Sequence, residues 1–171
     1  FADLLMQQGR YQERPALPYV PGMEFAGWVD ALGPETAGAN LGQRVAAFGG
    51  SGGLAEFAVV PAERLVPIPD GMGLAEAAGF QIAYGTSHLA LDHKARLQPR
   101  ETLLVLGAAG GVGLTGVEIG KRMGARVIAC ARGPEKREVA MAAGADAFID
   151  SETADLKAAF KAIGGVDVVY D

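Results

Sequence analysis

Cysteine and histidine are scarce in this chain of 171 residues, which has one cysteine and two histidines. A single thiol excludes an intrachain disulfide framework and a zinc site built from cysteines. It also makes a reducing, cytoplasmic location the default expectation. His88 and His93 are five residues apart, so a helix would not place them on one face. We therefore expect ordinary structural or surface roles for both imidazoles.

Excess basic charge and long apolar runs are also absent. The chain has 15 basic and 20 acidic residues and a net charge of −5, whereas a nucleic-acid surface needs clustered lysine and arginine. No uninterrupted apolar stretch approaches the roughly 18 residues of a membrane span. We expect neither a nucleic-acid partner nor a membrane partner. Half of the residues are hydrophobic, which is typical of a globular protein of one or two domains.

Glycine, by contrast, is abundant, and the chain divides into two regions with different patterns. Residues 1–73 contain short apolar runs, among them 54–69, that glycine and proline interrupt. They predict an antiparallel β domain with a short opening helix or turn near residues 3–8. Residues 74–94 are richer in helix formers and predict one or two helices broken near Gly85. We place the domain boundary between residues 73 and 74.

From residue 102 onward, apolar strands alternate with helices. Alternation with near-continuous apolar strands indicates an α/β fold with a parallel, doubly wound sheet. Ser151 is expected to cap the third of these helices. The predicted strands are 102–106, 126–131, 147–150 and 166–170, and the first two predicted helices are 113–123 and 134–143.

The first of these strands runs into a glycine-rich turn, GAAGGVG (107–113), that opens a helix. Gly110 and Gly113 occupy the second and third glycine positions of the GxGxxG pattern, and Ala108 occupies the first. Such a turn provides a tight bend, close helix–strand packing and free N–H groups for a pyrophosphate. Its place between strand and helix favours a dinucleotide site over a purely structural turn. The predicted cradle consists of Ala108, Gly110, Gly111, Val112 and Gly113.

The end of the second strand predicts which dinucleotide binds. An acid at this point would accept a hydrogen bond from the ribose 2′-OH of NAD(H). The chain instead has Ala131, followed by Arg132 and, at the start of the next helix, Lys136. Two cations and no acid favour the 2′-phosphate of NADP(H). The alternative is that both are solvated surface charges, with Lys136 paired to a nearby acid such as Glu135.

Several motifs occur in a specific order: PGMEFAGWVDALG, GQRVAAF, LAEFAVVPAERLVPIPDGM, GTSHLAL, LQPRETLLVLGAAGGVG and GVDVVYD. Through them the chain resembles the medium-chain dehydrogenase/reductase superfamily, in its zinc-independent quinone oxidoreductase (zeta-crystallin-like) branch. The resemblance implies a GroES-like catalytic domain over residues 1–73, a Rossmann dinucleotide-binding domain over 74–171, and a homodimer in the intact protein. Relatives run roughly twice as long, so we expect both domains to be partial and the sequence to be a piece of a longer polypeptide.

The resemblance also bears on metal binding. Where the zinc-dependent branch has Gly-His-Glu, this chain has Gly22-Met23-Glu24. A thioether is a poor zinc ligand compared with imidazole. The cysteine cluster that binds structural zinc in that branch is absent as well. We therefore expect no metal site.

Four further site residues are implied by the resemblance. Tyr11 matches an active-site tyrosine that would donate a proton to a developing enolate or quinol oxygen; the less favoured alternative is a packed loop tyrosine with a solvated hydroxyl. Asp3 matches a polar active-site position. Thr86 matches a threonine that contacts the nicotinamide end of the cofactor, and it could also be a helix N-cap. Ser151 stands where relatives often have a tyrosine near the adenosine phosphate, so it offers a hydroxyl without a stacking surface.

Without a metal, the predicted chemistry is hydride transfer to an acceptor whose negative charge is stabilised by hydrogen bonds. Quinones and conjugated enones fit this description. The leading prediction is NADPH-dependent reduction of a quinone, and the first alternative is reduction of an enoyl or enal C=C bond. Because a fold does not fix a function, a non-catalytic nucleotide-binding or crystallin-like protein is the second alternative.

Overall fold

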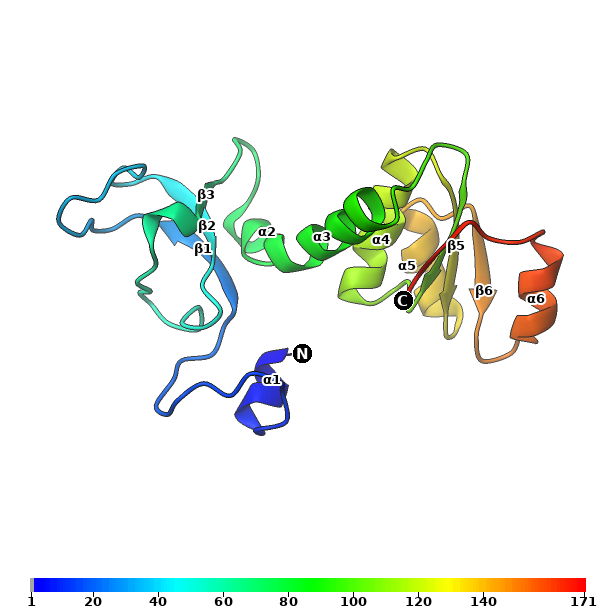
Figure 1. Ribbon diagram of the computed structural model, residues 1–171, viewed down its shortest axis with the longest axis horizontal. Helices are drawn as coiled ribbons and strands as arrows, with labels where there is room; N and C mark the ends of the chain where they lie inside the picture. Colours follow the sequence, from blue (N-terminus) through cyan, green and yellow to red (C-terminus); the bar gives the residue numbers. More distant parts are fainter. Residues whose placement is uncertain (1) are drawn as a thin grey trace. The chain divides into compact units, whose positions relative to one another are not determined.

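The structure is a computed structural model that describes residues 2–171, and it divides into two compact units. The first unit extends to Ile82, and the second is Ala83–Asp171. Each unit has its own sheet, as Figure 1 shows. The sequence pattern changes at residue 74, several residues before this division. Helix α2 (Leu74–Ala78) belongs to the first unit because it packs on the sheet of that unit.

The first unit is built on a three-stranded antiparallel sheet, as predicted from the sequence. Its strands lie in the order β1-β2-β3, and Ala46, Ile68 and Ala77 form its buried core. The elements of this unit are α1 (Ala2–Gln7), β1 (Glu24–Trp28), β2 (Arg44–Phe48), the 3-10 turn η1 (Ala62–Arg64), β3 (Leu65–Pro67) and α2.

One apolar stretch of the first unit does not form the strand that its sequence suggests. Residues 54–60 are coil, and Leu54, Phe57 and Val59 are exposed. Strand β3 pairs with β2 only over Leu65–Pro67, so residues 54–60 have no strand partner within the described part of the chain. The expectation from the apolar pattern was therefore wrong here, because a strand needs a neighbour to satisfy its backbone.

The second unit contains a four-stranded parallel sheet in the order β6-β5-β4-β7, which confirms the predicted doubly wound fold. Strand β4 is the first strand of this unit along the chain, and its neighbours β5 and β7 lie on opposite sides of it. The strand order therefore reverses beside β4, the position where doubly wound sheets bind their ligands. The elements are α3 (Gln81–His88), which begins in the first unit, the π-helical turn η2 (Leu89–Lys94), β4 (Thr102–Leu106), α4 (Gly111–Arg122), β5 (Arg126–Ala131), α5 (Pro134–Ala142), β6 (Ala147–Asp150), α6 (Leu156–Ala162) and β7 (Val168–Tyr170).

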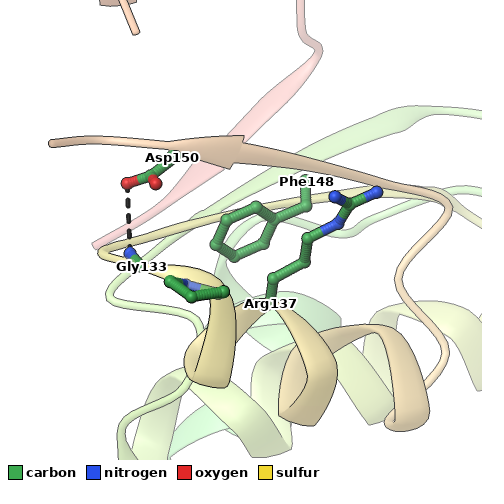
Figure 2. A pocket seen from close by; sticks show the side chains of 5 residues that line it. Gly133, Arg137, Phe148 and Asp150 are labelled. Atoms are coloured by element: carbon green, nitrogen blue, oxygen red, sulfur yellow. Dashed lines mark hydrogen bonds between the residues drawn. The ribbon is translucent and has the colours of Figure 1, made fainter. Parts of the chain in front are cut away.

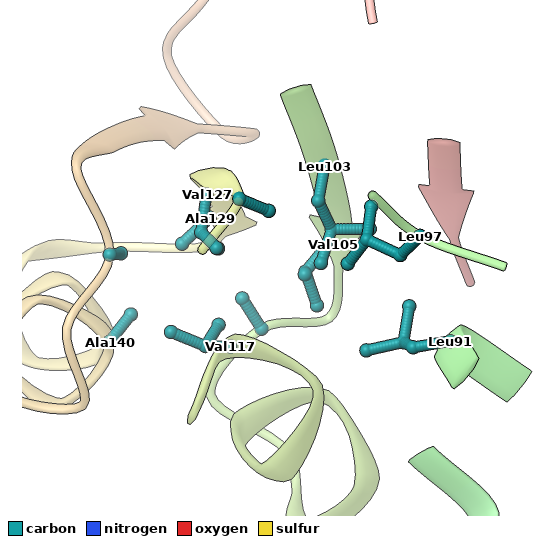
Figure 3. Close-up of a cluster of buried hydrophobic side chains, with 11 residues drawn as sticks. Leu91, Leu97, Leu103, Val105, Val117, Val127, Ala129 and Ala140 are labelled. Carbon is teal, nitrogen blue, oxygen red and sulfur yellow. The ribbon is translucent and has the colours of Figure 1, made fainter. Parts of the chain in front are cut away.

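Both faces of this sheet are buried, which explains why its strands are almost continuously apolar. Side chains on one face pack with Val117 of α4, Ala140 of α5 and Leu91 of η2 (Figure 3). Side chains on the other face pack against α6. The first set from the strands is Leu103, Val105, Val127 and Ala129, and the second is Leu104, Ile128, Cys130 and Ile149.

Two glycines of α4 let this helix lie close to the sheet. A Cβ atom at Gly116 would lie 2.5 Å from the Tyr170 ring, and one at Gly120 would lie 2.5 Å from Cδ2 of Leu103. Both distances are far below van der Waals contact. Helix α4 is therefore held against β4 and β7 at a separation that larger side chains would not allow.

Two expectations about helix ends were wrong. The helical segment breaks at Gly79, the C-cap of α2, whereas Gly85 lies inside α3. Glycine costs a helix interior only about 1 kcal/mol relative to alanine, which tertiary packing can offset. Helix α6 is capped not by Ser151 but by Asp155, whose Oδ1 accepts a 3.1 Å hydrogen bond from the N–H of Ala158.

Candidate functional site

The glycine turn between β4 and α4 is closed by contacts that only glycine permits. Gly107 has a φ of +58°, and its carbonyl accepts a 2.8 Å hydrogen bond from the N–H of Gly110. A Cβ atom at Gly113 would lie only 2.3 Å from the same carbonyl oxygen. Gly113 permits the close approach of helix to strand, as the third position of the GxGxxG pattern predicts. The bend lies at Gly107, one residue before Ala108, which occupies the first position of the pattern.

The first turn of α4 presents unpaired amides. Gly110 is the N-cap in extended conformation, and no side chain caps the helix. The first helix-type bond runs from the N–H of Leu114 to the carbonyl of Gly110, at 2.8 Å. The N–H groups of Gly111, Val112 and Gly113 therefore have no acceptor among the described residues. Together with the helix dipole, they form a positive site suited to a phosphate.

The surface in front of these amides is open. Nothing lies within 4 Å of the position that a Cβ atom would take on Gly111. The side chain of Ala108, in contrast, is fully buried in the core, and its N–H donates to the carbonyl of Cys130 at 3.1 Å. Ala108 therefore anchors the turn to the core of the second unit. Gly111 leaves room for a pyrophosphate to approach the backbone.

The predicted cations lie at the carboxyl end of β5. Ala131 is buried at the strand end, and both Arg132 and Lys136 are exposed. Neither cation makes an ion pair or a side-chain hydrogen bond within residues 2–171, so the expected alternative pairing of Lys136 with Glu135 does not occur. Both charges are therefore free to meet an anionic ligand.

An acid that sequence reasoning missed ties two loops together at this edge of the sheet. Asp150 ends β6 and lies opposite Ala131 of β5. Its Oδ1 accepts hydrogen bonds from the N–H of Glu152 at 3.0 Å and from that of Gly133 at 3.1 Å. These two backbone donors lower the pKa of the Asp150 carboxyl below its ordinary value. Ser151 adds a bond from its own N–H to the Ala131 carbonyl, at 2.9 Å.

A cavity of about 300 Å³ lies beside this link. Figure 2 shows Asp150 turned toward Gly133, while the Arg137 side chain extends along the Phe148 ring. Pro134, the first residue of α5, completes the lining. Arg137 was not predicted either, although it directly follows Lys136 in the sequence. The cavity shows that α5 and β6 form a hollow next to the predicted adenosine end of the site.

In the first unit, Asp3 holds the turn that leads to Met23. The Asp3 Oδ1 accepts a 2.8 Å hydrogen bond from the N–H of Gly22, whose φ is +100°. Met23 lines an open cavity of about 590 Å³ whose other walls include Phe48 and Arg64. Asp3 therefore orients the backbone of the turn that comes directly before Met23.

The remaining predicted residues are placed as follows. Tyr11 lies in a loop of the first unit, and its hydroxyl has no hydrogen-bond partner within the described chain. Thr86 is exposed in the interior of α3, so it is not an N-cap. His88 and His93 are both exposed.

Across residues 2–171, no three histidine, cysteine, aspartate or glutamate side chains are grouped so that they could hold a metal ion. The same residues include no helix with the length and apolarity to cross a membrane.

Comparison with known families identifies both units. Residues 1–70 match the model of the alcohol dehydrogenase GroES-like domain, and residues 111–171 match that of the zinc-binding dehydrogenase family. These are successive domains of one superfamily. The chain belongs to the medium-chain dehydrogenase/reductase superfamily.

Within this superfamily the similarity is to the quinone oxidoreductase branch. The chain is 41% identical to bovine (Bos taurus) quinone oxidoreductase-like protein 2 over 175 residues, which covers 100% of the chain and 50% of that relative. The quinone oxidoreductase of Thermus thermophilus, solved also with NADPH, has 39% identity and a TM-score of 0.86, with 99% of this chain and 52% of that chain covered. The enoyl reductase CurK has 31% identity and a TM-score of 0.82, with 97% and 51% covered. The chain thus spans about half the length of the relatives that it matches.

Proposed function

We propose that the intact protein is an NADPH-dependent oxidoreductase that reduces a quinone without zinc. The observation that carries this proposal is the open first turn of α4, with three unpaired amides beside the point where the strand order reverses. This arrangement fits the pyrophosphate of a dinucleotide. When bound, the nicotinamide of such a cofactor supplies a hydride to the acceptor.

The chain's own residues would hold the two ends of the cofactor differently. The N–H groups of residues 111–113 would bind the pyrophosphate, which NADPH and NADH share. Arg132 and Lys136 would bind the 2′-phosphate, which only NADPH has, and the Ser151 hydroxyl lies in the adjoining loop. The bonds from Gly133 and Glu152 to Asp150 hold these loops in place. We assign Thr86 to the nicotinamide end.

On the acceptor side, Tyr11 would be the proton donor. A phenol donates a hydrogen bond to an oxygen that gains negative charge, and it can pass its proton to that oxygen. Met23 replaces the imidazole ligand of the zinc-dependent branch, which supports a reaction without zinc even though the second family model is named for zinc binding. Asp3 orients the turn before Met23 through its bond to Gly22.

The test is oxidation of NADPH by the intact protein with a panel of quinones and conjugated enones, with and without a chelator. We expect turnover of quinones that does not depend on added zinc. If none of the acceptors on the panel is reduced, the proposed activity is refuted. NADPH binding without reduction of any acceptor would favour the non-catalytic alternative. Turnover that is lost with the chelator and restored by zinc would refute the zinc-free reaction.

Similarity to an enoyl reductase supports reduction of an activated C=C bond as the second candidate. Tyr11→Phe separates the two candidates in part. Proton transfer to carbon depends more strongly on a positioned acid than protonation of a quinol oxygen, because water readily protonates oxygen. A larger loss of rate with an enone than with a quinone is therefore expected. If wild type and Tyr11→Phe reduce both the enone and the quinone at equal rates, Tyr11 is not the proton donor.

A further inference from the structure

Three hydroxyl groups, two of them on buried residues and one on the half-buried Tyr170, form a hydrogen-bonded series, the buried hydroxyl chain, beside the first turn of α4. Ser87 of α3 is 0% exposed, and Thr115 of α4 is 6% exposed. Ser87 Oγ lies 2.7 Å from Thr115 Oγ1 and 2.9 Å from Tyr170 Oη at the end of β7. The chain therefore connects three elements that meet at the place where the strand order reverses.

The protons of these hydroxyls all have acceptors within hydrogen-bonding distance. Each hydroxyl has one proton to donate. The Val112 carbonyl lies 2.9 Å from both Ser87 Oγ and Thr115 Oγ1, and the Ala83 carbonyl lies 3.1 Å from Thr115 Oγ1. An arrangement in which Tyr170 donates to Ser87, Ser87 to Thr115, and Thr115 to the Val112 carbonyl gives every proton an acceptor. None of these three hydroxyls then remains unsatisfied.

The carbonyl at the end of this chain belongs to the first turn of α4. The C=O of Val112 and the N–H of Gly113 are parts of one planar peptide unit, in which they point in opposite directions. Fixing the carbonyl therefore fixes the direction of the N–H. The Gly113 N–H is one of the three amides without an acceptor among the described residues. The buried hydroxyls thus contact this peptide unit on its carbonyl side, opposite to the Gly113 N–H.

We propose that Ser87 is a positioning residue for dinucleotide binding, which acts by orienting the Val112–Gly113 peptide through the buried hydroxyl chain. This inference rests on the proposed binding of a dinucleotide at the first turn of α4. Ser87 does not contact the cofactor. Because the pyrophosphate is common to NADPH and NADH, losing the Ser87 hydroxyl should weaken both by the same factor.

A second contact between α3 and α4 provides a matched control. Tyr84 Oη lies 2.5 Å from Glu118 Oε2. Tyr84 precedes Ser87 by three residues and Glu118 follows Thr115 by three, so the two contacts are neighbouring bonds between the same helices. Glu118 lies beyond the first turn of α4. Tyr84→Phe should therefore loosen the helix pair without turning the Val112–Gly113 peptide.

The experiment measures dissociation constants for NADPH and NADH, together with the midpoint of urea unfolding, on the intact protein. We expect Ser87→Ala to raise both dissociation constants about tenfold, since it leaves buried polar groups without a partner. Thr115→Val, which keeps the shape and removes the hydroxyl, should do the same. Thr115→Ser, which keeps the hydroxyl, and Tyr84→Phe should stay within about twofold of wild type, even where their unfolding midpoints fall.

Wild-type affinity for both dinucleotides in Ser87→Ala and Thr115→Val would overturn the inference. It would also be overturned if Tyr84→Phe lost as much affinity as Ser87→Ala when the two variants are equally destabilised. If Ser87→Ala does not fold, Tyr170→Phe removes the first donor of the chain while keeping the ring beside Gly116, and the same outcomes apply. A wild-type protein that binds neither dinucleotide would overturn the proposed function as well. Normal wild-type binding with unaffected variants overturns only the role of Ser87.

Discussion

Gly111→Ala tests whether the open face of the first α4 turn receives a ligand. An alanine there meets no protein atom within 4 Å of its Cβ. The exchange should therefore leave the free energy of unfolding within about 1 kcal/mol of wild type, and alanine's better helix propensity favours a small gain. The added methyl group lies where a pyrophosphate would approach the backbone. Loss of one charge-assisted hydrogen bond, about 1.5–3 kcal/mol, predicts a dissociation constant for NADPH about 10- to 150-fold higher.

Gly113→Ala provides the contrast in the same turn. Its Cβ would lie 2.3 Å from the Gly107 carbonyl oxygen, so the turn must shift to admit it. Overpacking of this kind typically costs about 1–3 kcal/mol, so both stability and affinity should fall. Gly85→Ala in α3 is the matched control, since its Cβ also meets nothing within 4 Å. It should bind NADPH like wild type.

Isothermal titration calorimetry with NADPH and urea unfolding of the intact variants separate these cases. Wild-type affinity in Gly111→Ala would refute the placement of the pyrophosphate at this turn. An equal loss of affinity in Gly85→Ala would show that the measurement reports a general effect of replacing helical glycines. A stability loss in Gly111→Ala as large as that in Gly113→Ala would contradict the open space described above.

Three further predictions concern other parts of the second unit. Removing both Arg132 and Lys136 by alanine should weaken NADPH binding far more than NADH binding, and equal losses would refute the 2′-phosphate assignment. Because the folded-state pKa of Asp150 is lowered, its stabilising contribution is present above the ordinary pKa of about 3.9 and is lost as pH falls through the folded value. The difference in unfolding midpoint between wild type and Asp150→Asn should accordingly be constant from neutral pH to about pH 5 and then shrink; a constant difference down to about pH 2 would contradict this. Gly120→Ala, whose Cβ would lie 2.5 Å from Leu103 Cδ2, should lower stability by about 1–3 kcal/mol, and an unchanged unfolding curve would show that α4 can move away from the sheet.

The second unit followed its sequence closely because its signals are local. Strands 102–106, 126–131 and 147–150 have the predicted bounds, and the fourth, predicted over 166–170, begins at Val168. Both faces of this sheet are covered, so the apolar run alone marks the strand. Residues 54–60 of the first unit have a similar apolar pattern but no partner strand among the described residues, and they stay in coil. The pattern identified an element that could form a strand, and only pairing decides whether it does.

Only the part of the candidate site that depends on local sequence could be predicted. The glycine turn is contiguous in sequence, and its role could be inferred from spacing and from the strand before it. The bond from Gly133 to Asp150 joins residues 17 positions apart, and the bond between Ser87 and Tyr170 joins residues 83 positions apart. Such partners are brought together by the topology of the sheet. A serine or an aspartate in the sequence gives no sign of a partner so distant.

The close contact between Gly113 and Gly107 has a consequence for how affinity is distributed over the site. The turn is already set, so its amides need no rearrangement to receive a phosphate, and little entropy is lost there on binding. That contribution is the same for every dinucleotide. Discrimination must then come from the loops that follow β5 and β6. Preference for one cofactor could change through exchanges in those loops, while the rigid part of the site and the stability of the sheet stay as they are.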